Sequence, residues 1–234
     1  MQHKPSMNSP ERTQFVNSKQ GLLLQVILVL IPPVLFLKSV YLLLGLSLSL
    51  LLAWAMLRLR GKKWQDVGLK KPEHLGRLLF ITLIAVAILL PLSSLAIHIV
   101  EILTESTPNL EAFEQIRGNL VALAGGLVIA WIFGALLEEL LLRGFLLNTL
   151  YELFSYKNCP QRLTWTVAVL VTSVITGIGH CYQGIVGMVG TGLIAVGFSA
   201  IYLMNRRNLW SCILAHGLYN TVAFILVYRG IVLH

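Results

Sequence analysis

Long apolar runs separated by short polar stretches make up most of the chain. Seven such runs cover residues 21–37, 40–57, 78–100, 120–141, 163–183, 185–204 and 208–228. A helix that crosses the hydrocarbon core of a bilayer needs about 20 mostly apolar residues, and each run is close to that length. The pattern predicts an all-α integral membrane protein, a polytopic helical bundle of about seven transmembrane helices. The range is six to eight, because the first two runs lie close together.

Composition supports the membrane assignment and indicates one domain. Of the 234 residues, 56% are apolar and 12% are charged, and the mean hydropathy is +0.78; a soluble domain carries about 25% charged residues. A polar N-terminal segment, residues 1–20, precedes the first run, which lacks a small-residue cleavage site and is interpreted as a retained span. Without repeats or low-complexity stretches, residues 21–234 are predicted to form a single transmembrane domain.

The net charge of +8 comes largely from one connection. Seven of the 18 basic residues lie between the second and third runs: Arg58, Arg60, Lys62, Lys63, Lys70, Lys71 and Arg77. Such clustering is typical of a cytoplasmic loop, so the expected partner is the lipid bilayer and not a nucleic acid. The connection 101–119 holds four glutamates and one arginine. The N-terminus is therefore predicted on the inner side, in a membrane expected to be the bacterial cytoplasmic membrane, and the oligomeric state is left open.

Ionisable residues inside the runs are few, and each costs about 2.5–3.5 kcal/mol to insert. Glu139 and Arg143 are four residues apart with the acid first, the favourable order for a helical ion pair. Glu138 is rotated by about 100° from Glu139 and has no such partner, so its carboxylate is a candidate for proton transfer.

Two later runs add further polar groups. His216 and Asn220 are four residues apart and project from one helical face, as a pair of donors to an oxyanion would. His180 lies in a separate run. A carboxylate, a second imidazole and a donor pair are the parts needed to hydrolyse an amide.

As a spaced set, Glu138-Glu139-x-x-x-Arg143-Gly144, His180 and His216-x-x-x-Asn220 resemble the CPBP (CAAX protease and bacteriocin-processing, Abi) family of glutamate-type intramembrane proteases, over about residues 110–228. The resemblance implies that Glu138 activates a water with help from His180, that His216 and Asn220 hold the oxyanion, and that Glu139 and Arg143 brace the first group. It also implies an endopeptidase similar to type II CAAX prenyl endopeptidases, which needs no cofactor.

The implied partner is a membrane-associated peptide or lipid-modified protein, of prenylated CaaX type or bacteriocin type. Two positions depart from the family pattern. Thr176 stands where a phenylalanine is usual, four residues before His180, and Leu142 replaces a frequent aromatic residue before Arg143. Both departures bear on the shape of the substrate pocket more than on the chemistry.

Three alternatives remain open. Glu138, His180 and His216 could hold a catalytic zinc ion as a His₂Glu set. The stretch Gly197-Phe198-Ser199-Ala200, followed by His216, is similar to the GxSG loop of a serine intramembrane protease. A non-enzymatic membrane protein, either an immunity factor or a transporter-like peptide binder, would also contain intramembrane charges.

The run boundaries create a geometric conflict. Glu138 would lie about 27 Å along a helix that starts at Leu120, near the inner face, whereas His180 would lie near the outer face. We therefore expect either a shifted or tilted fourth helix or a chain that bends back within residues 177–190.

Overall fold

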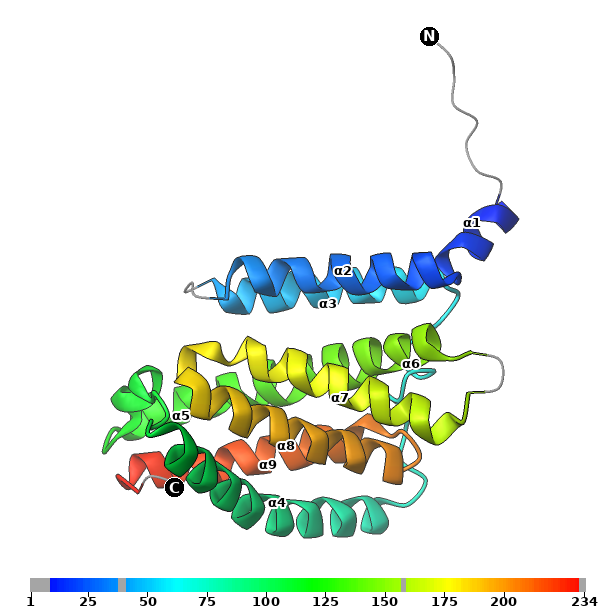
Figure 1. The fold of residues 1–234 in the computed structure, drawn as a ribbon. Helices are drawn as coiled ribbons and strands as arrows, with labels where there is room; N and C mark the ends of the chain where they lie inside the picture. The colour runs from blue at the N-terminus through cyan, green and yellow to red at the C-terminus, as the bar shows by residue number, and fades with distance from the viewer. Residues whose placement is uncertain (1–8, 38–40, 157–158, 232–234) are drawn as a thin grey trace.

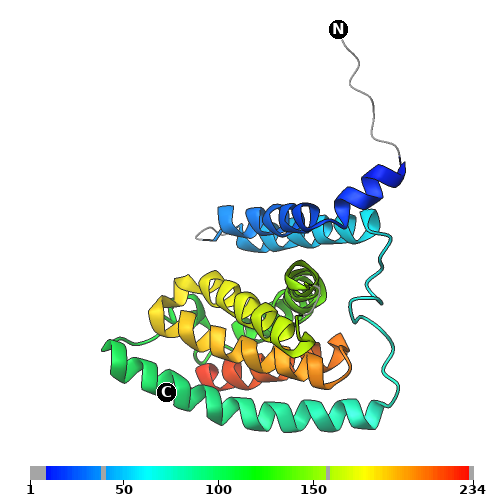
Figure 2. The ribbon, with the colours of Figure 1, turned by 45° about the vertical axis from the view of Figure 1, so that its right-hand side comes forward.

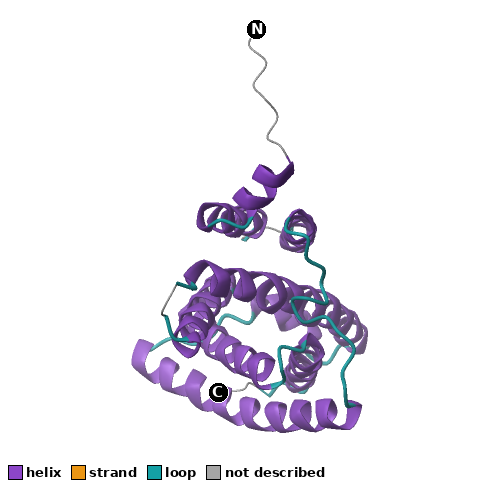
Figure 3. Cartoon of the chain, turned by 90° about the vertical axis from the view of Figure 1, so that its right-hand side faces the viewer, coloured by secondary structure: helices purple, strands orange, loops and turns teal. Residues whose placement is uncertain are grey.

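The computed structural model describes residues 9–37, 41–156 and 159–231, and every regular element among them is a helix (Figures 1 and 3). In chain order these elements are α1 (Ser9–Val16), α2 (Lys19–Leu35), α3 (Leu42–Leu59), α4 (Leu75–Thr104), η1 (Glu111–Ile116), α5 (Leu120–Ile129), η2 (Ala130–Glu138), η3 (Leu140–Leu147), α6 (Asn148–Phe154), α7 (Gln161–Gly179), η4 (Cys181–Gln183), α8 (Gly184–Met204) and α9 (Leu209–Tyr228).

Each of the seven apolar runs forms a helix. Six helical stretches of the described chain are long and apolar enough to cross a membrane: Leu42–Leu59, Leu75–Thr104, Leu120–Phe154, Gln161–Gly179, Cys181–Met204 and Leu209–Tyr228. The helix of the first run, Lys19–Leu35, has 17 residues and is shorter than these spans. The chain is therefore an all-α polytopic membrane bundle, as the hydropathy pattern predicted, with a count inside the expected range.

The fourth span is longer than its apolar run. Elements α5, η2, η3 and α6 follow one another without a break to form a 35-residue rod that ends at Phe154 instead of residue 141. The rod continues because its polar residues are satisfied inside the protein: the Asn148 amide donates to the carbonyls of Arg143 and Gly144 and to the Tyr202 hydroxyl. Hydrogen bonding in η2 and η3 follows the π-helical pattern. π-Helical segments are rare in proteins overall, and those that occur often lie at functional sites.

The long helices run roughly alongside one another, so their connections gather at two ends (Figure 1). We call the end with the 60–74 and 205–208 connections the basic end, and the end with the 105–119 connection and the 180–183 turn the acidic end. α2 and α3 form a hairpin on one side of the bundle (Figure 2), where they pack on η2, η3 and α6.

The loop after α3 is fixed onto the basic end. The Tyr202 hydroxyl donates to the carbonyl of Val67 at 2.9 Å, and the amide of Leu209 donates to the carbonyl of Gly68 at 2.9 Å. Gly68 has φ +112°, and a Cβ there would lie 2.5 Å from a backbone oxygen of Arg207. Only glycine fits this close approach, so the loop covers the end of the bundle tightly.

Candidate active site

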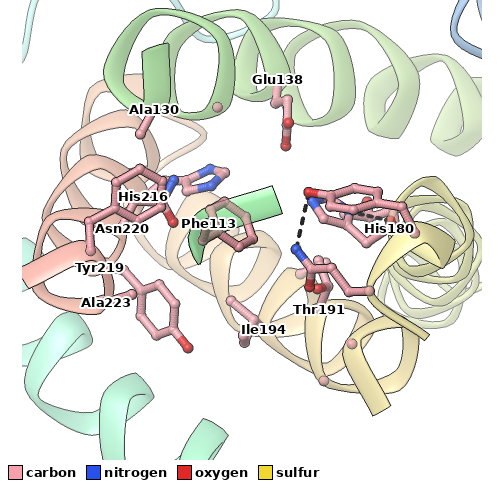
Figure 4. Close-up of a pocket in the computed structure, with 18 of the residues that line it drawn as sticks. Phe113, Ala130, Glu138, His180, Thr191, Ile194, His216, Tyr219, Asn220 and Ala223 are labelled. Atoms are coloured by element: carbon pink, nitrogen blue, oxygen red, sulfur yellow. Dashed lines mark hydrogen bonds between the residues drawn. The ribbon is translucent and has the colours of Figure 1, made fainter. Parts of the chain in front are cut away.

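The predicted catalytic residues meet at one cavity of about 350 Å³. Glu138 lines it from η2, His180 from the end of α7, and His216 and Asn220 from α9. Figure 4 shows the Glu138 carboxylate pointing into the cavity, with His216 and Asn220 on one side and His180 on the other. The structure thus brings together four side chains from three helices that are far apart in the sequence.

The length of the fourth span changes the position expected for Glu138 relative to His180. Because the rod continues to Phe154, Glu138 lies near its middle and not close to either end. α7 ends at Gly179, His180 follows as its C-terminal cap, and the chain turns through η4 into α8. Both expected features are present: the fourth helix extends further than its apolar run, and the chain bends back within residues 177–190.

Among the described residues, no side chain or backbone group makes a hydrogen bond to the Glu138 carboxylate. It is half-buried, at the C-terminal end of η2. The Tyr182 side chain lines the same cavity. A carboxylate without a fixed partner in a membrane-embedded cavity is available to bind water and to exchange a proton.

His216 is held by a buried ion pair. Its Nδ1 lies 2.8 Å from Oε1 of Glu139, and Nη1 of Arg143 donates to the same oxygen at 3.0 Å. The Phe198 ring stacks on the imidazole of His216 with ring centroids 4.7 Å apart. The Arg143 guanidinium lies 5.6 Å from the centroid of the same Phe198 ring. An Nδ1–H that donates to Glu139 leaves Nε2 as the nitrogen that can act in the cavity.

Glu139 and Arg143, the pair expected to brace Glu138, make their hydrogen bonds elsewhere. Glu139 contacts His216, and Nη2 of Arg143 donates to the carbonyl of Ala195 at 3.0 Å. Glu139 and Arg143 are 0% and 1% exposed. Adjacent positions on a helix point in different directions, so Glu139 faces the protein interior while Glu138 faces the cavity.

Asn220 and His216 converge on Gly134, one turn before Glu138. A Cβ at position 134 would lie 3.1 Å from Nδ2 of Asn220 and 3.9 Å from Nε2 of His216. The absent side chain leaves room for both polar tips beside the rod. Sequence reasoning missed Gly134; the available signal was a glycine four residues before the unpaired acid.

His180, like His216, is held through its Nδ1. Its Nδ1 lies 2.9 Å from the backbone oxygen of Thr176, which leaves Nε2 free, and its ring lies 5.8 Å from that of Tyr182. Thr176, the departure from the family pattern, is buried and donates its own hydroxyl to the carbonyl of Thr172. The substitution therefore leaves the anchor of His180 in place, because that anchor is a backbone group.

The alternative centres find less geometric support. In the part of the chain that the structure describes, no group of three His, Cys, Asp or Glu side chains is gathered closely enough to bind a metal ion. Ser199 is fully buried and donates its hydroxyl to the carbonyl of Ala195 at 2.8 Å, so it is not presented to a substrate.

The fold and the site together define a multi-pass membrane protein with a cavity lined by one carboxylate, two anchored imidazoles and one amide. Residues 120–222 match the family model of type II CAAX prenyl endopeptidase Rce1-like proteins. The match covers every residue of the candidate site and confirms the resemblance to the CPBP family. It points to a protease of the membrane. No curated protein and no solved structure matches the chain.

Proposed function

We propose that the protein is a glutamate-type intramembrane endopeptidase in which Glu138 activates water. The observation that carries the proposal is the convergence of Glu138, His180, His216 and Asn220 on one cavity, with the Glu138 carboxylate free of hydrogen-bond partners among the described residues. Such an arrangement supplies a base, an imidazole that helps to bind the attacking water, and two hydrogen-bond donors for an oxyanion.

The reaction follows from these positions. A water between Glu138 and Nε2 of His180 loses a proton to the carboxylate as its oxygen attacks the scissile carbonyl carbon. The developing oxyanion accepts hydrogen bonds from Nδ2 of Asn220 and from Nε2–H of His216. The C–N bond then breaks as Glu138 returns the proton to the leaving amine.

His216 has to carry two protons to serve as an oxyanion donor. Its Nδ1–H is directed to Glu139, so donation from Nε2 requires the imidazolium form. The Glu139 carboxylate oxygen lies 2.8 Å from Nδ1 of His216, and Nη1 of Arg143 donates to the same oxygen. Glu139 is therefore proposed as a positioning residue for His216.

The proposed substrate is a membrane-associated polypeptide of prenylated CaaX type or bacteriocin type. Apolar side chains form much of the cavity wall away from Glu138, including Leu42, Leu43, Phe113 and Phe224. A volume of about 350 Å³ is at the small end of the range for binding pockets. It suits a short extended segment and not a folded domain.

The test is peptide cleavage by the purified protein. Wild type is expected to cut members of a peptide library, and Glu138→Gln is expected to reduce the rate by at least about 10³-fold, since it removes the base but keeps the shape. Glu73→Gln is the matched control, because Glu73 pairs with Arg206 on the exposed surface. Unchanged cleavage by Glu138→Gln would refute the mechanism. Biological function without any cleavage would favour the non-enzymatic peptide binder.

We also propose that the N-terminus faces the cytoplasm of a bacterial cell. The proposal rests on charge: within the described residues, the basic end holds 11 Lys and Arg against three Asp and Glu, whereas the acidic end holds two against four. The first set is Lys19, Arg58, Arg60, Lys62, Lys63, Lys70, Lys71, Arg77, Arg162, Arg206 and Arg207, against Asp66, Glu73 and Glu152; the second is Arg117 and Arg229, against Glu101, Glu105, Glu111 and Glu114. The positive-inside rule assigns the basic end to the cytoplasm.

A further inference from the structure

The cavity reaches one end of the bundle and not the other. Beyond Glu138, its wall continues along residues that belong to the acidic end: Leu42 and Leu43 at the start of α3, Pro108, Leu110 and Phe113 in the 105–119 connection, and Val227 and Ile231 near the end of α9. Ile231 is 52% exposed, so the wall runs out to the surface there.

Toward the basic end, the cavity is closed by packed side chains. Every residue from Glu139 to Leu150 is buried, and none of these except Arg143 lines the cavity. Tyr202 and Cys212 are 0% exposed at the same level. Beyond them, Arg60 donates to the hydroxyl of Thr149 and pairs with Glu152, which ties the loop after α3 to α6. A substrate has no open path to Glu138 from this side.

Combined with the charge distribution, these facts fix the side of access. We infer that the catalytic cavity opens to the outer, extracytoplasmic face of the membrane, so that its substrate is a membrane-held polypeptide presented from that face. This inference deepens the proposed function and rests on it. An exported peptide still attached to the membrane, of the bacteriocin type, has the required chemistry. The CaaX-type C-terminus of a cytoplasmic protein cannot reach Glu138 from that face, so the inference narrows the two proposed substrate types to the bacteriocin type.

The walls explain how such a chain is held. The part of the cavity nearest the acidic end is lined by Leu, Ile, Phe and Val side chains from α3, α4, η1 and α9. An extended segment that enters from the outer leaflet buries apolar side chains against these walls. Its scissile peptide then meets the polar groups near the middle of the rod, where the bilayer and the packed basic end exclude bulk water.

Thiol labelling tests the side of access without requiring catalysis. In intact bacterial spheroplasts, with Cys159 and Cys181 changed to serine, a membrane-impermeant maleimide is applied to single-cysteine variants. Cys212 is retained because it is 0% exposed and serves as a thiol that reacts only after denaturation. Three substitutions at uncharged residues place one cysteine at each end of the bundle and one in the cavity: Ala112→Cys, Gln65→Cys and Thr191→Cys. Ala112 and Gln65 are exposed at the acidic and basic ends, and Thr191 lines the cavity wall on α8.

The expected result is labelling of Ala112→Cys at least tenfold faster than Gln65→Cys in intact spheroplasts, with position 65 reacting fully only after permeabilisation. Thr191→Cys should label without permeabilisation, more slowly than Ala112→Cys. The inference is overturned by the reverse order at 65 and 112, by equal labelling at both ends, or by labelling of Thr191→Cys only after permeabilisation or only after denaturation. Failure of the proposed function is separate: it would show as loss of peptide cleavage in wild type while the labelling pattern holds.

Discussion

Gly134→Ala offers a sharp test of the donor pair, because it adds one methyl group at the point where the two polar tips converge. The new Cβ would lie 3.1 Å from Nδ2 of Asn220 and 3.9 Å from Nε2 of His216. The first contact is too tight, so the Asn220 amide has to move by some tenths of an ångström. The imidazole is held by Glu139 and keeps its place.

The size of the effect follows from the loss of one aligned donor. Removing an oxyanion donor costs about 10²–10³ in kcat, and a misplacement of about 1 Å costs about 10². A partly displaced amide should therefore lower kcat by about 10- to 100-fold, or about 1.4–2.7 kcal/mol of transition-state stabilisation. Helix formation opposes any loss of stability, since alanine is favoured over glycine by about 1 kcal/mol. The unfolding temperature should not fall.

The assay is steady-state peptide cleavage in detergent, with Gly125→Ala as the matched control. Gly125 lies in the same rod, and a Cβ there meets nothing within 4 Å, so its cleavage rate should stay within twofold of wild type. A double-mutant cycle adds Asn220→Ala. Because the methyl group acts through Asn220, the double variant should be no slower than Asn220→Ala alone. Wild-type kcat in Gly134→Ala, or additive losses in the double variant, would refute the reasoning.

Three further predictions test the surroundings of the site. Glu139→Gln leaves the Arg143 guanidinium buried without a carboxylate and replaces the charged anchor of His216 by a neutral amide. It should lower the free energy of unfolding by about 3–5 kcal/mol and abolish cleavage, and thermal unfolding at wild-type temperature would contradict this. Chelation followed by dialysis should leave cleavage intact for a glutamate-type mechanism, whereas loss that added Zn²⁺ restores would establish the His₂Glu zinc centre instead. Ser199→Ala should retain cleavage within about threefold in the same peptide assay, since its hydroxyl is buried against Ala195; a loss of 10³-fold would revive the serine alternative.

The spans could be predicted from the sequence because a bilayer imposes a simple requirement. Apolar runs near 20 residues have few stable arrangements other than membrane-crossing helices. The end of the fourth helix was not predictable in this way. Residues 142–150 contain Arg143, Asn148 and Thr149, which hydropathy treats as signs of water, but all three are buried with partners inside the protein. Hydropathy records the polarity of a side chain and not whether another helix satisfies it.

The site residues were predictable as a set, but their pairings were not. Spacing places Glu139 and Arg143 on one face and His216 and Asn220 on another, since residues four apart are neighbours in any helix. Which set meets which depends on the packing of α9 against η2, a tertiary contact with no local signal. The anchors of the two histidines differ in kind for the same reason. His180 uses a backbone oxygen four residues earlier, whereas His216 uses a carboxylate 77 positions away.

The paired glutamates show how one helix can supply two unlike carboxylates from adjacent positions. A rotation of about 100° turns Glu138 to the cavity and Glu139 to the packed interior, so their environments differ although their chemistry is the same. Glu139 is fully buried, and one of its oxygens contacts both Arg143 and His216. It therefore holds the imidazole of His216 in place. Glu138 has no hydrogen-bond partner among the described residues and lines the cavity, which suits its proposed role as the base. Environment assigns different roles to like groups, and exchange of roles would require a turn of the whole rod. Glu139→Gln should therefore abolish cleavage in the peptide assay although Glu138 keeps its carboxylate, because Glu138 faces the cavity and not Nδ1 of His216; cleavage at the wild-type rate would contradict this assignment.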